Sequence, residues 1–207
     1  MRSSGWALAL AGVCAAATIA ACTQSQAGQA APATTTEPSG APSTSSVAPT
    51  IPPRPKELKL DDVDPCALFT KPQLAQLKVD RTRQRTSNAE HYRGMRECVL
   101  MVEKQPPVYD YGALAVTNEG IAPWLSGNRN VEAKLTSVAG FAAATYWFRG
   151  AQGTNAADCS VSVDVAEGQQ LVIDTNNDGT HSFTLEQMCQ RVEQAAGLAV
   201  QTLQTLK

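Results

Sequence analysis

Apolar and polar residues alternate most regularly over residues 159–165, where every second residue is apolar. Residues 169–174 follow as a second, largely apolar run behind the pair Glu167-Gly168. An alternation with period two predicts a strand with one buried face, and the Glu-Gly pair is typical of a tight turn. We therefore expect an antiparallel hairpin in this part of the chain.

Further strands are predicted upstream of this hairpin. Residues 98–102 form a short apolar run and residues 109–117 alternate, which predicts two antiparallel strands joined across residues 105–107. Residues 131–138 and 141–148 flank Ala139-Gly140, a pair that favours a turn between two strands. Together these patterns predict one antiparallel sheet of about five to six strands.

The C-terminal end has the spacing of a long amphipathic helix. Thr184 and Gln187 form a capping box that predicts a helix start, and the pattern continues to residue 206. An apolar stripe of this width is typical of a helix that lies on a sheet. The stripe consists of Leu185, Met188, Val192, Ala195, Ala199, Leu203 and Leu206.

Two start signals also occur before the first strand. Asp64-Pro65 combines a capping residue with a proline at the first helical position, and Thr70 with Gln73 forms a second capping box. They predict a broken helix over residues 65–78, and one or two helical turns are expected at residues 119–125. We expect an α+β fold in which the N-terminal broken helix and the long C-terminal helix pack on the sheet.

The N-terminal residues have the order of a secretory signal, with a positive charge at Arg2 followed by an uncharged apolar stretch over residues 5–19. This stretch is shorter than the about 20 residues of a spanning helix. Ile19-Ala20-Ala21-Cys22 resembles the lipobox of bacterial lipoproteins, which implies cleavage before Cys22 and a diacylglycerol, with fatty acids such as palmitate, on its sulfur. A plain signal peptide with a coincidental cysteine is the alternative.

The composition then divides the chain into three parts. Residues 1–21 are the predicted signal, and residues 22–56 are rich in Thr, Ser, Ala and Pro with few apolar side chains to offset the cost of ordering. This second part is expected to be a disordered tether, either O-glycosylated or unmodified. Residues 57–207 remain, and their length predicts a single globular domain.

The cysteines are consistent with export. Cys14 lies in the predicted signal and Cys22 in the lipobox, which leaves an even number for the domain. An even number of cysteines in an exported chain predicts disulfides, and the four remaining cysteines allow three pairings. Cys66 with Cys98 and Cys159 with Cys189 is the pairing we prefer, because each bond then joins neighbouring elements without crossing the other.

The charge excludes one class of partner. The chain has a formal net charge of −2, and removing the signal takes away Arg2 and no acid. A nucleic-acid-binding domain needs a clearly basic face, so nucleic acid is not expected as a partner. A membrane is not excluded, because the lipid anchor would supply that affinity.

The domain also resembles a known family. Asp64-Pro65-Cys66-Ala67-Leu68-Phe69-Thr70 opens it, a second cysteine follows about 30 residues on, a third leads a strand and a fourth lies in the closing helix. Behind a lipobox and a Thr/Pro-rich linker, this layout resembles the actinobacterial lipoproteins grouped as the domain of unknown function numbered three-five-five-eight. The resemblance covers residues 62–206 and implies a cell-surface lipoprotein of the cell envelope, without implying an activity.

One motif is similar to half of a calcium loop. Asp174, Asn176 and Asp178 are spaced like the first three ligands of such a loop, and Gly179 follows at the turn position. The acid that should close the loop, Glu186, lies one place late in the predicted helix. We consider a weak calcium site at these three residues beside the alternative, a polar loop with Asx turns.

Two sets of residues are candidates for ligand binding. Arg81, Arg83 and Arg85 share one face if their segment is extended, where they could bind phosphate or carboxylate, for instance in lipid head groups; solvated charge on an edge strand is the alternative. Trp124, Tyr146 and Trp147 could line a groove, and core packing is the alternative there.

The sequence gives little sign of catalysis. It has no G-x-S-x-G, H-E-x-x-H or glycine-rich phosphate motif, and its histidines are His91 and His181. We name no catalytic residue, and no cofactor apart from the weak calcium site. The favoured hypothesis is a lipid-anchored protein on the outer face of the plasma membrane that binds an envelope protein, a lipid or a glycolipid. The alternative is an extracytoplasmic hydrolase with a Ser/His/Asp-type site assembled by the fold.

Overall fold

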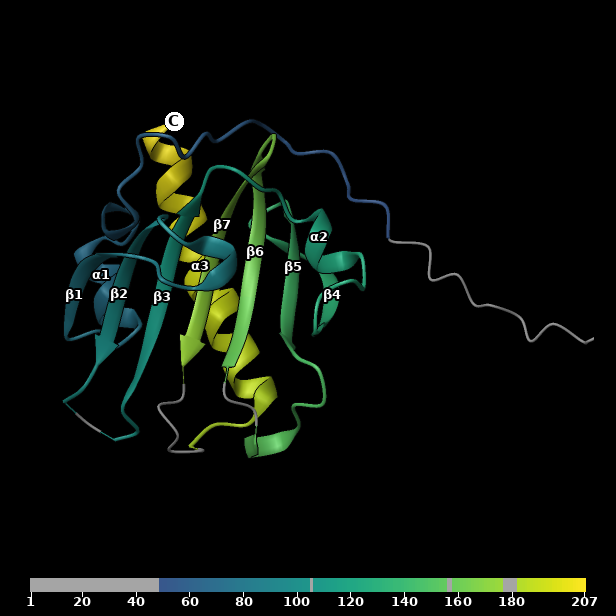
Figure 1. Cartoon of the computed structure of the whole chain (residues 1–207). Helices are drawn as coiled ribbons and strands as arrows, with labels where there is room; N and C mark the ends of the chain where they lie inside the picture. The colour runs from purple at the N-terminus through teal and green to yellow at the C-terminus, as the bar shows by residue number, and fades with distance from the viewer. Residues whose placement is uncertain (1–48, 105, 156–157, 177–181) are drawn as a thin grey trace, which may run out of the picture. The chain divides into compact units, whose positions relative to one another are not determined.

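The computed structural model describes residues 49–104, 106–155, 158–176 and 182–207. Seven strands form one antiparallel sheet in the spatial order β1-β2-β3-β7-β6-β5-β4, so β1 and β4 are its edges (Figure 1). The strands are β1 (Arg81–Thr86), β2 (Arg96–Val102), β3 (Tyr109–Val116), β4 (Val131–Val138), β5 (Phe141–Phe148), β6 (Asp158–Ala166) and β7 (Gln169–Asn176).

The helical elements are short apart from the last. They are the 3-10 turns η1 (Pro65–Leu68), η2 (Glu90–Tyr92) and η3 (Gly153–Asn155), and the α-helices α1 (Lys71–Gln76), α2 (Ala122–Leu125) and α3 (Leu185–Leu206). No helix in the described ranges has the length and apolar character needed to cross a membrane. The predicted α+β class, the single antiparallel sheet and the C-terminal helix are confirmed.

Two predictions about the fold need correction. The sheet has seven strands, one more than the upper limit predicted. The additional strand is β1, which pairs with β2. All six residues of β1 are exposed, so its sequence shows no apolar alternation. The broken helix predicted over residues 65–78 is not confirmed. This region instead contains η1, whose Asp64 cap accepts a hydrogen bond from Cys66 N, and the six-residue helix α1, which has no buried residue.

The predicted turn between β4 and β5 and the predicted cap of α3 are both present. Ala139 and Gly140 have positive φ angles of 49° and 86°, a left-handed conformation that makes the two-residue turn between β4 and β5. Thr184 accepts a hydrogen bond from Gln187 N, and the Gln187 side chain accepts one from Thr184 N. This capping box satisfies two backbone donors at the start of α3.

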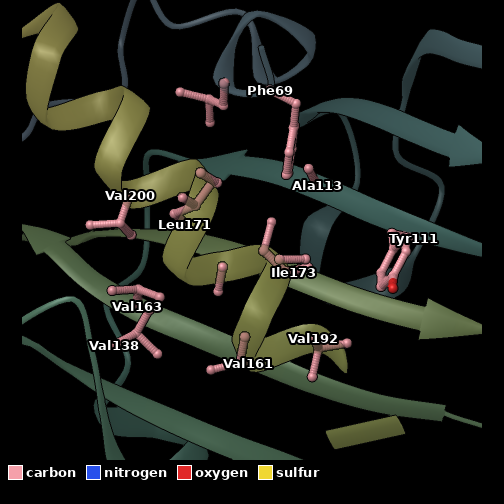
Figure 2. Close-up of a cluster of buried hydrophobic side chains, with 14 of the residues drawn as sticks. Phe69, Tyr111, Ala113, Val138, Val161, Val163, Leu171, Ile173, Val192 and Val200 are labelled. Carbon is pink, nitrogen blue, oxygen red and sulfur yellow. The ribbon is translucent and has the colours of Figure 1, made fainter. Parts of the chain in front are cut away.

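The main core lies between α3 and one face of the sheet, which we call the α3 face. Figure 2 shows Val192 and Val200 of α3 directed at Val161 and Val163 of β6 and at Leu171 and Ile173 of β7. Tyr111 and Ala113 extend this layer to β3, as Figure 2 also shows. All of these side chains are almost fully buried, so the predicted stripe of α3 is the surface that covers the sheet.

Both preferred disulfides are present. Cys66–Cys98 joins η1 to β2 with a Cα–Cα distance of 5.0 Å, and Cys159–Cys189 joins β6 to α3 with a Cα–Cα distance of 5.2 Å. Each bond therefore holds a helical element on the α3 face against a strand beneath it.

The opposite face of the sheet, which we call the α2 face, has a second and smaller core. It contains Leu114, Trp124, Tyr146 and Val172, with η2 and α2 packed over the strands. Residues 51–54 approach the same side of the domain, and we call them the N-terminal strap. Ile51 packs against this smaller core, so the described part of the chain makes tertiary contacts from residue 51 onward.

Candidate functional site

The aromatic residues predicted to line a groove lie on two different faces. Trp124 and Tyr146 stack on the α2 face with ring centroids 4.0 Å apart and an angle of 6° between the rings. Arg129 covers the other side of this stack, with its guanidinium carbon 3.8 Å from the Trp124 ring centroid. The Tyr146 hydroxyl is 2.9 Å from that of Tyr92, and all three aromatic residues are buried. Trp124 and Tyr146 therefore belong to the core.

Trp147 points to the α3 face, because neighbouring residues of a strand point to opposite faces. It is half-buried and lines an open groove of about 640 Å³ between α3 and the β4–β5 hairpin. Thr145 lies in this groove and donates a hydrogen bond to Glu193, and Lys134 Nζ is 5.2 Å from the Trp147 ring centroid. Of the predicted aromatic set, Trp147 alone lines a groove within the described residues.

The three predicted arginines lie on one side of β1, because every second residue of a strand points to the same face. Arg85 pairs with Glu97 at 2.5 Å, and the Glu97 side chain is only 4% exposed. Arg81 pairs with Glu103 at 2.9 Å. Arg83 is exposed and has no ion pair within the described residues. Arg81 and Arg85 thus have intramolecular partners, and an anion would have to compete with them.

The predicted calcium residues are described only in part. Asp178 lies outside the described residues, and Asn176 is the last residue of β7. Asp174 lies in β7 on the α2 face and accepts a hydrogen bond from Gly112 N at 2.9 Å. No group of three metal-ligating side chains occurs in the described ranges. The calcium site remains a prediction.

Asp174 belongs to a cluster of acids at one end of the α2 face. Burial, together with the negative charge of Glu97, raises the pKa of Asp174 to about 6. Burial likewise raises the pKa of Asp158 to about 6, and Asp158 Oδ1 has no hydrogen-bond partner among the described residues. An acidic cluster of this kind is electrostatically costly. The hydrogen bond from Gly112 N and the positive charge of Arg85 offset part of this cost at Asp174.

The histidines do not form a described catalytic site. His91 is exposed, and its ring meets the Trp124 ring edge-on at a centroid distance of 5.8 Å. His181 lies outside the described residues. The hydrolase hypothesis therefore remains an untested prediction.

The sequence did not predict a pocket that lies on the α3 face, on the opposite side of α3 from the groove of Trp147. It has a volume of about 490 Å³ and opens between α1, the β2–β3 hairpin and the start of α3. We call it the basic pocket. Its lining residues are Ala75, Lys78, Val79, Asp80, Val102, Lys104, Pro106, Pro107, Tyr109, Phe183 and Arg191.

The basic pocket combines an apolar wall with an excess of positive charge. Arg191 Nη1 donates a hydrogen bond to the Tyr109 hydroxyl at 2.9 Å, and the guanidinium carbon lies 4.1 Å from the Phe183 ring centroid. Lys104 pairs with Asp80 at 3.3 Å. Lys78 has no hydrogen bond or ion pair of its side chain within the described part of the chain. The pocket therefore has three cationic side chains and one acid.

Sequence reasoning missed the basic pocket because no local motif marks it. Lys78 follows α1, Lys104 lies between β2 and β3, and Arg191 belongs to α3. The sheet topology and the packing of α3 bring these three segments together. The only available signal was Arg191 next to Val192, which is a polar position at the border of the apolar stripe of α3.

Comparison with known proteins gives one match. No curated protein and no solved structure matches the chain significantly. A family model described as "Protein of unknown function (DUF3558)" matches residues 17–202, which include the whole sheet and nearly all of α3. The chain therefore belongs to the DUF3558 family of proteins of unknown function.

Proposed function

We propose that the protein is a lipid-anchored lipoprotein of the cell envelope that binds an anionic lipid or glycolipid in the basic pocket. The observation that supports this proposal is the composition of the pocket, in which Lys78, Lys104 and Arg191 face a wall that includes Val102 and Phe183. Cationic groups beside an apolar wall suit a ligand with an anionic head and an apolar body.

Arg191 is well placed for this role. Its guanidinium lies against the Phe183 ring and is held by the Tyr109 hydroxyl, which restricts its orientation before any ligand arrives. A planar guanidinium can donate two parallel hydrogen bonds to a phosphate or a carboxylate. Lys78 and Lys104 would add positive charge at the rim, where Lys104 already pairs with Asp80.

The proposed anchor would place the domain close to such ligands. Lipidation of Cys22, followed by the predicted tether up to the N-terminal strap at residue 51, would allow a reach of roughly 30 Å from the bilayer. Two disulfides agree with an oxidising compartment outside the cytoplasm. Metabolic labelling with a radioactive fatty acid tests the anchor: the chain is expected to be labelled, and the Cys22→Ser variant is expected to be unlabelled and shed into the medium. Labelling of both chains, or of neither, would contradict the anchor.

Calorimetric titration tests the ligand. Dihexanoyl phosphatidylglycerol, an anionic lipid used below its micelle concentration, is expected to bind at least about tenfold more tightly than the zwitterionic dihexanoyl phosphatidylcholine. Lys78→Gln/Lys104→Gln should lose most of this binding. Lys59→Gln/Lys71→Gln removes the same charge outside the pocket and should bind like the unaltered chain. Equal binding of the two lipids, or equal loss in both variants, would overturn the proposal.

A further inference from the structure

The edge strand β4 has unpaired backbone groups along its outer side. Arg149 N donates to Asn130 O at 3.3 Å, just before the start of β4. In antiparallel pairing, a residue that is hydrogen-bonded to its opposite partner, as Asn130 is, directs both its N–H and its C=O toward the neighbouring strand. Even-numbered residues of β4 therefore bond to β5. The odd-numbered residues direct their N–H and C=O outward, where the described part of the chain contributes no further strand.

The side chains of β4 also alternate in character. Glu132 and Lys134 are exposed on the α3 face, whereas Val131, Ala133 and Leu135 are half-buried on the α2 face. Phe148 of β5 lies directly opposite Val131 and is 56% exposed, which makes it one of few large exposed apolar residues in the described part of the chain. A free edge flanked by apolar side chains is a surface on which another strand can pair.

We propose that two copies of this chain pair through β4 in antiparallel fashion, with a two-fold axis at Ala133. Ala133 then lies opposite Ala133 of the second copy, and Val131 lies opposite Leu135. Each of these residues directs its N–H and C=O outward, so the pairing satisfies backbone groups on both strands. Within the described ranges, one outward bond must yield, the 3.2 Å bond from Arg149 Nη2 to Val131 O.

Charge selects this register from the others. Outward groups pair only when odd residues face odd residues, so the alternatives are shifts by two residues of one strand against the other. With the axis at Ala133, Glu132 of each copy faces Lys134 of the other, which gives two attractive pairs. A shift in one direction places Glu132 opposite Glu132, and a shift in the other places Lys134 opposite Lys134. Like charges directly opposite each other in a sheet are destabilising.

The apolar side of the same register is complementary as well. Leu135 of one copy would lie beside Val131 of the other, and Phe148 flanks Val131 on its own sheet. The three residues would form a continuous apolar row across the junction on the α2 face. The row would cover part of Phe148, which is exposed in the single chain.

The other edge of the sheet is unsuited to self-pairing. In β1, Arg81, Arg83 and Arg85 recur at alternate positions, so an antiparallel β1 pair brings arginines of the two copies opposite each other or diagonally adjacent. The two edges of the sheet thus differ: β1 repels a second copy, and β4 attracts one. Pairing through β4 alone is closed by its two-fold axis and produces dimers, without larger assemblies.

Charge reversal is the first test of the dimer. The full chain is followed by sedimentation equilibrium in density-matched detergent, where it is expected to show a monomer–dimer equilibrium. Glu132→Lys or Lys134→Glu alone should weaken the dimer by about tenfold, because each variant creates two repulsive pairs. The double variant Glu132→Lys/Lys134→Glu should restore it, and Lys71→Glu, a charge reversal elsewhere, should leave it unchanged. Monomer at every concentration, or a double variant as weak as the single ones, would overturn the proposal.

A cysteine placed at the axis tests the register. In the proposed dimer the two Ala133 Cα atoms are about 5.5 Å apart, which permits a disulfide, whereas the two Ser137 Cα atoms are separated by about 27 Å. Ala133→Cys in the full chain in its own membrane should give a reducible covalent dimer after mild oxidation, and Ser137→Cys should not. Equal cross-linking of both variants would contradict the register. Thermal unfolding of each variant verifies that it is folded.

Discussion

At the scale of single residues, the acid cluster on the α2 face shows how packing sets the properties of one carboxyl. Asp174 lies over Gly112, whose backbone N–H donates to its Oδ1, while Glu97 adds negative charge nearby. The hydrogen bond favours the charged carboxylate, and burial disfavours it. Burial is the larger effect, because the pKa of Asp174 rises to about 6.

This raised pKa has a direct consequence for stability. Between the ordinary pKa of 3.8 and the folded value of about 6, the folded state holds a proton that the unfolded state has released, so the free energy of unfolding falls as pH rises through this window. Asp174→Asn should therefore raise the free energy of unfolding at pH 7 by about 1 to 3 kcal/mol and have little effect below about pH 4. Urea unfolding at both pH values measures it, with the exposed Asp62→Asn as the control. An Asp174→Asn variant that is less stable at pH 7 would contradict the prediction.

Gly112 and Gly197 form a matched pair for a second prediction. A Cβ atom at Gly112 would lie 2.3 Å from Asp174 Oδ1, whereas a Cβ atom at Gly197 in α3 would have no atom within 4 Å. Gly112→Ala should lower the free energy of unfolding by about 1 to 3 kcal/mol, because Asp174 must leave its hydrogen bond. Gly197→Ala should raise it by about 0.5 to 1 kcal/mol, because alanine favours a helix. Thermal or urea unfolding decides, and destabilisation of similar size in both variants would contradict this account.

At the scale of elements, two copies of one motif have different surroundings. Thr184 with Gln187 and Thr70 with Gln73 form capping boxes at the starts of α3 and α1. Helix α3 buries its apolar stripe on β6 and β7, whereas α1 has no buried residue. Loss of the α3 cap is therefore expected to weaken the main core. Helix α1 contacts α3 through the Gln73 side chain, which donates to Leu198 O and accepts from Thr202 Oγ1, so loss of its cap is expected to have a smaller effect.

The two capping threonines should accordingly respond differently to substitution. Thr184→Ala is expected to lower the free energy of global unfolding by about 1 kcal/mol. Thr70→Ala is expected to change it by less than about half of that and to increase hydrogen exchange of amides in α1 alone. Hydrogen exchange with urea unfolding measures both effects. Equal global destabilisation by the two variants would mean that α1 contributes to the cooperative core.

Elements that depend on local signals were predictable from the sequence, and those that depend on long-range packing were not. The turn at Ala139-Gly140, the cap of α3 and both disulfides follow from short patterns or from counting. Strand β1 gives no alternation, because both of its faces are exposed, and it is a strand only through pairing with β2.

The candidate site residues were likewise predictable only where local geometry decides their positions. Tyr146 and Trp147 are adjacent in β5, and the strand geometry sends them to opposite faces, so they could not line one groove together. The side of the sheet on which each would be buried depended on α2 and α3, which the pattern alone did not place. The cations of the basic pocket come from three distant segments, and only the assembled sheet shows that they are neighbours.

At the scale of the whole molecule, the N-terminal strap determines where the packed domain begins. Arg54 donates to both carboxylate oxygens of Asp164 at 3.0 and 2.8 Å, and it also pairs with Glu57 and Glu167 at 2.8 Å each. Asp164 is 5% exposed and lies in β6, so this contact fastens the strap to the sheet near the β6–β7 turn. A tether that pulls on the domain would act first on the apolar contact of Ile51 and then on this ion cluster.

Replacement of Arg54 tests the strap. Arg54→Gln should lower the free energy of unfolding at pH 7 by about 2 to 4 kcal/mol, because Asp164 is left buried without its cation. The loss should shrink toward pH 4, because burial raises the pKa of Asp164 and protonation removes the uncompensated charge. Arg54→Gln/Asp164→Asn should regain most of the stability at pH 7, and limited proteolysis should still cut both variants at residues 49–56 faster than the unaltered chain. If the double variant is as unstable as Arg54→Gln, Asp164 is not the group that Arg54 compensates, and the strap is held by its apolar contact at Ile51 instead.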